Sequence, residues 1–405
     1  MIFTNKSVQM LKYEKARAKL VEFSVPADKY PNFPLDSTDL ILTTIYALSK
    51  YSERYISAGY KGEIVDNTDL RVVSQYYDNL TRSDDHEVYS DTYLLLGSIA
   101  YFCLENFGSA KVLISKICPE KLDSTLEKTL FCVLDLLLNN TYSNQQVFEN
   151  YSPYQIEFIQ ALTAHFKNGD YFSEVENKLQ LLYQATLSSN DPYEVTYVDF
   201  LFPIIVLAKE YSAWNILPLY SQSTKNSWEA YLVLPYSIHL LWPAQKAIIE
   251  KNTLTGANAV IPLPTGVGKT KSFELLIYSR LYIQGKKNIV IIAPLRALCN
   301  EISSDIKKAF RGFEDLDVTK FTDVYQEDSY FNNDKRNVII STPEKLMYVM
   351  RHEPQFIDQI DLFIFDEAHL FDDESRGITY ELLITDISRL KTADCQTIFF
   401  SAILS

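Results

Sequence analysis

Apolar side chains in the first 240 residues recur at the spacing of amphipathic helices. Four stretches place them at i, i+3, i+4 and i+7, namely Asp91–Phe107, Leu126–Leu138, Tyr154–Lys167 and Glu174–Leu187. Polar or glycine-containing segments interrupt the pattern between these stretches. Because helices joined by short turns pack as antiparallel hairpins, we expect residues 1–225 to form a mostly α-helical domain.

Beyond residue 240 the pattern changes to short, continuously apolar runs separated by helical stretches. The runs Val260–Leu263, Ile289–Ile292 and Asp361–Phe365 have the length and composition of buried parallel strands. A helix is expected from Lys269, after which apolar residues follow at helical spacing until Gly285. Alternating strands and helices indicate an α/β domain, a parallel sheet with flanking helices, over residues 226–405.

The segment Pro264–Thr270 has the composition of a phosphate-binding loop between a strand and a helix. Gly266 and Gly268 let the backbone approach phosphates without an intervening Cβ, and the helix N-terminus adds N–H donors. Lys269 is expected to reach the β- and γ-phosphates, and the Thr270 hydroxyl to ligate Mg²⁺. The residues expected to bind the nucleotide here are Thr265, Gly266, Val267, Gly268, Lys269 and Thr270.

Two acidic residues, Asp366 and Glu367, follow the apolar run Asp361–Phe365. A carboxylate at a strand end beside a phosphate loop can hold the same Mg²⁺, directly or through water, and we assign that role to Asp366. Glu367 is the candidate to orient and deprotonate the attacking water. The predicted catalytic residues are therefore Lys269, Asp366 and Glu367, acting on a nucleoside triphosphate with Mg²⁺.

The overall composition is that of a folded, soluble protein. With 405 residues the chain has room for two or three domains, and 47% hydrophobic residues suffice for real cores. There is no run of 18 apolar residues and no signal-peptide pattern, so we expect a cytoplasmic protein without a membrane segment. The five cysteines show no paired metal-ligand spacing and are expected to be reduced core residues.

The net charge of −14 is unusual for a protein that binds nucleic acid. Residues 1–240 hold 19 Lys and Arg against 29 Asp and Glu, whereas residues 241–405 hold 19 against 23. The acidic first part is a poor ligand for a phosphate backbone. It is either a docking module for a basic partner protein or a structural domain that packs on the α/β domain, and the sequence favours neither.

The two motifs above and further segments within Leu241–Ser405 resemble those of superfamily-two helicases of the DEAH type. The motif sequences are most similar to those of the Ski-two-like branch. Leu241-Trp242-Pro243-Ala244-Gln245 resembles the glutamine motif, in which the glutamine reads the adenine edge. The resemblance therefore implies that the nucleotide is ATP and that Gln245 binds it, and the alternative is an ordinary glutamine at a helix start. Arg376-Gly377, shortly after the acidic motif, also recurs in this group.

Two segments resemble motifs that meet the nucleic-acid backbone. Ala293–Leu298 contains Arg296, and Val338–Lys345 contains Thr342, which is also expected to be the N-cap of a helix. The resemblance implies that Arg296 and Thr342 contact backbone phosphates.

The resemblance assigns His369 and Ser401 to the coupling of hydrolysis to domain movement. Ser401 begins Ser-Ala-Ile where the family has Ser-Ala-Thr, so Ile403 lacks the threonine hydroxyl and coupling through that position is in doubt. Leu263 likewise replaces the first glycine of the strict phosphate loop, a departure common among helicases.

The resemblance implies an ATP-dependent helicase or translocase, with DNA expected rather than RNA. A helicase motor needs two RecA-like domains and these 405 residues show the motifs of the first only, so we expect little or no ATP turnover from them alone. Similar helicases occur in bacterial antiphage systems of the Hachiman type, paired with a nuclease effector. The alternative is a scaffold whose ATPase acts as a switch, holding and releasing such a partner protein through the acidic helical domain.

Overall fold

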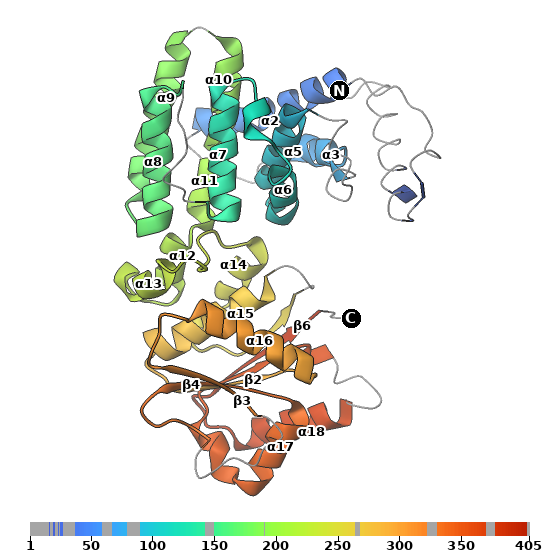
Figure 1. Ribbon diagram of the computed structural model, residues 1–405, viewed down its shortest axis with the longest axis vertical. Coiled ribbons are helices and arrows are strands. Elements are labelled where there is room, and N and C mark those ends of the chain that lie inside the picture. Colours follow the sequence, from blue (N-terminus) through green and yellow to red (C-terminus); the bar gives the residue numbers. More distant parts are fainter. Residues whose placement is uncertain are drawn as a thin grey trace. The chain divides into compact units, whose positions relative to one another are not determined.

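The computed structural model divides the chain into two compact units, Met1–Ser212 and Ala213–Ser405 (Figure 1). It describes residues 16, 19–20, 23, 25–26, 37–58, 67–78, 90–141, 150–189, 191–263, 268–321, 330–369 and 377–402. The division precedes the boundary after residue 225 that the sequence suggested. Trp214 and Trp228 are both buried in the core that also holds the strands, and this packing assigns the segment between them to the second unit.

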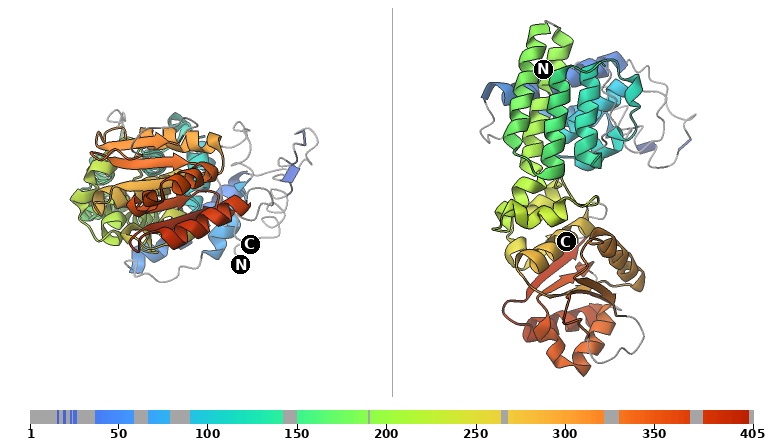
Figure 2. Two further views of the ribbon diagram at one scale, coloured as in Figure 1. Left: turned by 90° about the horizontal axis from the view of Figure 1, so that it is seen from below. Right: turned by 60° about the vertical axis from the view of Figure 1, so that its left-hand side comes forward.

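The first unit is helical, as expected (Figure 2). In chain order its elements are α2 (Ser37–Ala58), α3 (Thr68–Ser74), α5 (Asp91–Cys103), α6 (Phe107–Ile114), the 3₁₀ helix η2 (Pro119–Lys121), α7 (Thr125–Asn139), α8 (Pro153–Asn168), α9 (Phe172–Ser189), α10 (Pro192–Asp199) and α11 (Leu201–Tyr211). Three of the four predicted stretches match α7, α8 and α9 to within two residues at each end.

Local sequence explains where α7 and α8 begin. The Ser124 and Ser152 hydroxyls accept hydrogen bonds from the N–H groups of Glu127 and Gln155, whose side chains accept from the capping residues in return. At its other end α8 stops at Gly169, which takes the left-handed conformation at φ 78°.

The fourth predicted stretch, Asp91–Phe107, is wrong near its end. The helix α5 stops at Cys103, and Phe107 opens α6. Between them Glu105 takes a positive φ of 61°, and its carboxylate accepts a hydrogen bond from the Tyr211 hydroxyl. The N–H groups of Glu105 and Asn106 close this turn by donating to the carbonyls of Phe102 and Tyr101, and Tyr211 contacts it from far along the chain.

The second unit alternates helices and strands. In chain order its elements are α12 (Ala213–Tyr220), α13 (Lys225–Leu232), α14 (Pro243–Ile249), η3 (Thr253–Thr255), β1 (Ala259–Pro262), α15 (Lys269–Tyr278), the π-helical η4 (Ser279–Ile283), β2 (Asn288–Ile292), α16 (Arg296–Ala309), β3 (Leu316–Lys320), β4 (Arg336–Ser341), α17 (Pro343–His352), η5 (Pro354–Gln359), β5 (Leu362–Phe365), α18 (Gly377–Leu390) and β6 (Gln396–Ser401). Within the described ranges of both units, no helix combines the length and apolarity that crossing a membrane requires.

The six strands form one parallel sheet in the order β1-β6-β5-β2-β4-β3. The predicted α/β fold with a parallel sheet and flanking helices is thereby confirmed. The chain returns to the middle of the sheet for its last strand, since β6 pairs with β1 on one side and β5 on the other.

Successive strand residues face opposite layers. In β2, Ile289 and Ile291 belong to one core with α15 and α16, whereas Val290 and Ile292 belong to a second core with α17 and α18. Both faces of the sheet are therefore buried at its centre, which explains why β2 and β5 are almost continuously apolar. The edge strand β1 is not the buried strand that the sequence predicted, because Val260 is 53% exposed. The carboxyl ends of all six strands consequently lie at one edge, where ligands of open α/β sheets bind.

Candidate active site

The predicted phosphate loop joins β1 to α15. Its residues Thr265, Gly266 and Val267 lie outside the described residues, as does Pro264. Gly268 is described and takes φ of 85°, and Lys269 opens the helix α15. Thr270 follows as a half-buried residue in the first turn of the same helix. The strand, glycine and helix start therefore occur in the predicted order.

The Lys269 side chain meets both acidic residues of the Asp-Glu-Ala-His segment. Its Nζ lies 2.7 Å from Oδ1 of Asp366 and forms a second ion pair with Oε1 of Glu367. The side chain of Asp366 is 4% exposed and that of Glu367 is 17% exposed. The fold thus brings the three predicted catalytic residues together, although 98 positions separate Lys269 from Glu367.

The backbone holds Asp366 firmly at the end of β5. Its N–H donates to the Ile292 carbonyl at 2.8 Å, and its own carbonyl accepts the Tyr380 hydroxyl at 3.2 Å. Its carboxylate Oδ1 also accepts the N–H of Glu367 at 3.0 Å. Glu367 has φ of 49°, a conformation that costs a non-glycine residue about 1–2 kcal/mol.

Charge in this cluster is unbalanced. Burial raises the pKa of Asp366, and the charge of Glu367 acts in the same direction against the opposing effect of Lys269. Burial alone would lower the pKa of Lys269, but hydrogen bonds and charge from the two carboxylates outweigh it and raise the pKa. One ammonium group therefore faces two carboxylates, and the site has acceptor capacity for a further cation.

The donor set suits Mg²⁺ bound together with a triphosphate. Mg²⁺ usually takes one or two protein oxygens and completes its octahedron with phosphates and water. Asp366 and the hydroxyl of Thr270 could supply such oxygens. Accordingly, the part of the chain that the structure describes has no group of three or more His, Cys, Asp or Glu residues that could hold a metal by itself.

Gln245 lies against Gly268, at the start of α15. It is 3% exposed, and its Oε1 accepts the N–H of Trp242 at 2.8 Å at the start of α14. Its Nε2 donates to the carbonyl of Gly268 at 3.3 Å. The contact with Trp242 is that of a glutamine at a helix start, whereas the contact with Gly268 did not follow from the sequence.

His369 and Ser401 also lie around the cluster. The Nδ1 atom of His369 is buried 3.4 Å from Oε2 of Glu367, without hydrogen-bond geometry. Ser401 ends β6, and its carbonyl accepts the N–H of Leu263 at 2.8 Å, just before the loop. Arg376 and Ile403 lie outside the described residues.

Arg296 and Thr342 stand at the same edge of the sheet. They follow the paired ends of β2 and β4, where Ile292 is in register with Ser341. Arg296 is exposed in the first turn of α16. Thr342 is the N-cap of α17, as predicted, but its side chain makes no capping hydrogen bond, which leaves its hydroxyl available to a ligand.

Residues 242–405 match the family model described as DEAD/DEAH box helicase. These residues form a DEAD/DEAH box helicase domain. The match contains the site residues named above, from Gln245 to Ser401. The helicase domain occupies most of the second unit, Ala213–Ser405.

Two proteins and one solved structure are similar to parts of this chain. The Hachiman protein HamB of Bacillus cereus is 25% identical over 342 residues, covering 80% of this chain and 30% of its own. The ATP-dependent DNA helicase Hel308 of Methanococcus vannielii is 33% identical over 171 residues, covering 41% of this chain and 22% of its own. The solved structure of Saccharomyces cerevisiae Dbp5 bound to RNA and ADP BeF3 has 19% identity and a TM-score of 0.33, covering 40% of this chain and 41% of its own.

The two relatives differ in how far they match. The similarity to Hel308 has about the length of the helicase domain. The similarity to HamB covers 80% of the chain, whereas the second unit holds only 405 − 212 = 193 of the 405 residues, so it must extend into the helical unit. The chain spans less than a third of the length of either relative.

Proposed function

We propose that this chain is the ATP-binding part of a nucleic-acid helicase or translocase. The observation that carries the proposal is the cluster of Lys269, Asp366 and Glu367 at the carboxyl edge of the sheet, inside a helicase domain. In this proposal the loop residues Thr265 to Thr270 hold the triphosphate and Gln245 holds the adenine.

Each member of the cluster takes one role. Lys269 leaves the two carboxylates for the β- and γ-phosphates when ATP binds, which frees Glu367 to accept a proton from the attacking water. Asp366, fixed at the end of β5, and Thr270 provide the oxygens for Mg²⁺. Mg²⁺ would neutralise the negative charge that builds up on the phosphates during transfer.

The proposed nucleic-acid contacts are Arg296 and Thr342, which follow neighbouring strand ends. DNA rather than RNA is supported by the 33% identity with a protein named as a DNA helicase. Because the bulk charge is −14, the contacts supplied by this chain are local and most of the affinity resides elsewhere in the motor. His369 and Ser401, which lie beside Glu367 and Leu263, link the site to movement of a second RecA-like domain.

Steady-state ATPase activity of the chain, with and without single-stranded DNA, duplex DNA and RNA, tests the proposal. We expect slow turnover, because an arginine from a second domain contributes about 10³–10⁵-fold in other phosphoryl-transfer systems. Lys269→Ala should abolish both binding of a fluorescent ATP analogue and turnover. Lys307→Ala, which changes an exposed lysine on α16, is the control and should leave both unchanged.

Glu367→Gln separates binding from chemistry. It should retain the ATP analogue and lose turnover in the longer protein, because the amide can still fill the site but cannot accept a proton. A Glu367→Gln protein with full turnover would remove Glu367 from the role of base.

A second candidate function is an ATPase switch that holds and releases a partner protein. It is favoured by the match to HamB, which reaches into the helical unit, and by the 18 Lys and Arg against 28 Asp and Glu in residues 1–212. In this proposal the chain acts in a Hachiman-type antiviral defence system, and the partner is a nuclease effector with a basic surface. Purified effector should bind the full chain without nucleic acid, and ATP or DNA should weaken that contact. The switch is contradicted if the effector does not bind, or if ATP and DNA leave its binding unchanged.

A further inference from the structure

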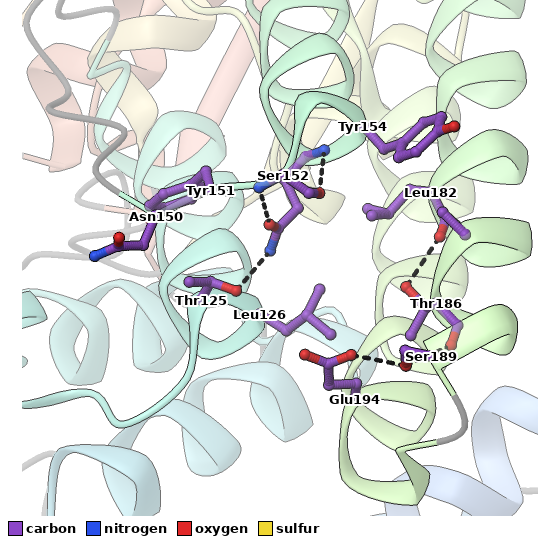
Figure 3. Close-up of a pocket in the computed structure, with 12 residues that line it drawn as sticks. Thr125, Leu126, Asn150, Tyr151, Ser152, Tyr154, Leu182, Thr186, Ser189 and Glu194 are labelled. Carbon is purple, nitrogen blue, oxygen red and sulfur yellow. Dashed lines mark hydrogen bonds between the residues drawn. The ribbon is translucent and has the colours of Figure 1, made fainter.

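A cavity of about 450 Å³ opens in the helical unit, where α7, α8, α9 and α10 come together (Figure 3). Thr125, Tyr151 and Ser152 line one side of it, and Leu182, Thr186 and Glu194 line the other. Its volume is within the usual range for small-molecule sites. It belongs to neither the ATP site nor the helicase domain.

Most polar groups of the cavity already have partners inside it. Gln155 accepts the N–H of Ser152 at 2.8 Å and donates to the Thr125 hydroxyl at 3.2 Å. The Thr186 hydroxyl donates to the carbonyl of Leu182 at 2.9 Å. These groups shape the cavity but have little hydrogen-bonding capacity left for a ligand.

Glu194 is the one ionised side chain among the described residues that line the cavity. Among the described residues its carboxylate accepts one hydrogen bond, from the Ser189 hydroxyl at 2.9 Å. A carboxylate has about four lone-pair positions, so most of its capacity is unused. Among the described residues that line the cavity, none is Lys, Arg or His, and the other polar ones, such as Asn150 and Tyr154, are neutral. A ligand that donates hydrogen bonds and carries a positive charge therefore fits this lining best.

The surroundings favour the same charge. Residues 150–199 hold two lysines against seven Asp and Glu. One of these lysines, Lys178, is engaged in ion pairs with Glu157 and Glu174. The apolar wall formed by Leu126, Leu182 and Ala185 would pack against an aliphatic stem.

We propose that this cavity binds an alkylammonium group, with the charged head on Glu194 and the aliphatic stem along Leu126, Leu182 and Ala185. The group is either a free aliphatic amine or a lysine side chain of another protein, since both present the same chemistry.

Isothermal titration of the full chain with butane-1,4-diamine and with a blocked lysine, Nα-acetyl-lysine methylamide, tests the proposal. Binding of the diamine alone identifies a small-molecule site, and binding of the blocked lysine identifies a site for a protein side chain. Glu194→Gln should weaken the binding at least about tenfold, because it removes a charge-assisted hydrogen bond. Ala185→Phe should also weaken it, by filling the cavity.

Two further variants serve as controls. Glu157→Gln removes an acidic side chain that is 48% exposed on α8 and does not line the cavity, so binding should be unchanged. Ser189→Ala removes the hydroxyl bound to Glu194 and keeps the carboxylate, so binding should be equal or tighter. The proposal is overturned if neither amine binds, if Glu157→Gln weakens binding as much as Glu194→Gln, or if inorganic phosphate binds in place of the amines.

Discussion

The side-chain amide of Gln245 lies directly on the backbone of Gly268. Its Nε2 is 3.3 Å from the Gly268 carbonyl oxygen, and a Cβ placed on Gly268 would lie 2.4 Å from that nitrogen. Gly268 also takes φ of 85°. The backbone conformation therefore favours glycine before Lys269, and a side chain there would also force the end of the Gln245 side chain to move.

Gly268→Ala should lower stability by about 1–2 kcal/mol through the left-handed backbone and should also displace Gln245, which weakens ATP binding. Gly285→Ala is the matched control, because Gly285 has φ of 69° but no atom within 4 Å of the added Cβ. Denaturant unfolding and titration with a fluorescent ATP analogue measure the two effects. If both variants bind the analogue equally, the contact with Gln245 is not needed for the site.

Lys269→Met should destabilise the nucleotide-free chain by about 1–3 kcal/mol, because Asp366 is 3% exposed and would lose its cation. Adding Asp366→Asn should restore part of that loss. Lys286→Met is the control, since the Lys286 side chain is 34% exposed and its ion pair with Asp361 is 3.7 Å long. The urea midpoints of the parent, the two single lysine variants and the double variant measure these differences in stability. Equal losses of stability in Lys269→Met and Lys286→Met would contradict a stabilising role for the cluster.

Asp199 should make the helical unit more stable as the pH falls. Burial raises its pKa to about 6, and its Oδ1 is buried without a hydrogen-bond partner in the described part of the chain. The unfolded value is about 3.9, so the folded state binds the proton more tightly and gains stability from about pH 7 to about pH 4. Asp199→Asn should therefore be about 1–2 kcal/mol more stable than the parent at pH 7.5, with no advantage near pH 4. Urea unfolding of the parent and of Asp199→Asn at the two pH values measures this. The same difference in stability at both pH values would contradict a raised pKa of Asp199.

Gly97→Ala should destabilise the helical unit although alanine favours helices. The added Cβ would lie 2.3–2.8 Å from the ring atoms Cδ1, Cε1 and Cγ of Tyr77, which is fully buried and bonded to Thr44. Overpacking of this kind costs about 1–3 kcal/mol, more than the gain of about 1 kcal/mol in helix propensity. Gly312→Ala, where the nearest atom is Cδ2 of Leu234 at 3.6 Å, should be nearly neutral. A thermal midpoint for Gly97→Ala at or above that of the parent would show that Tyr77 can move aside.

Features encoded over a few residues were predictable from the sequence. The helices α7, α8 and α9 follow from apolar periodicity. The expected strand at Val260–Leu263 is β1, Ala259–Pro262, displaced by one residue. The sequence likewise predicted that a strand, a glycine, Lys269 and a helix follow one another, because each of these depends on its neighbours in the chain.

Features that depend on distant partners were not predictable. Glu105 contacts Tyr211 and Gln245 contacts Gly268, and no local pattern shows either contact. The hydrogen bond from the Tyr380 hydroxyl to the Asp366 carbonyl could not be predicted, because the sequence of a helix does not reveal which residue a given tyrosine contacts. A one-dimensional pattern specifies which residues are buried, but not which of them meet.

The place of β6 in the sheet has a consequence for how the domain is made. Among the described strands β1 pairs only with β6, from which it is separated by 139 positions in the register Ala259 to Ile398. While the polypeptide emerges from the ribosome, β1 therefore has no strand neighbour until β6 has been synthesised. During that time β1 is unpaired on both sides and β5 is unpaired on the side that β6 will occupy, so the nascent domain is open there to aggregation and to chaperones. Because this closure joins such distant segments, it should be the slow step in folding of the domain.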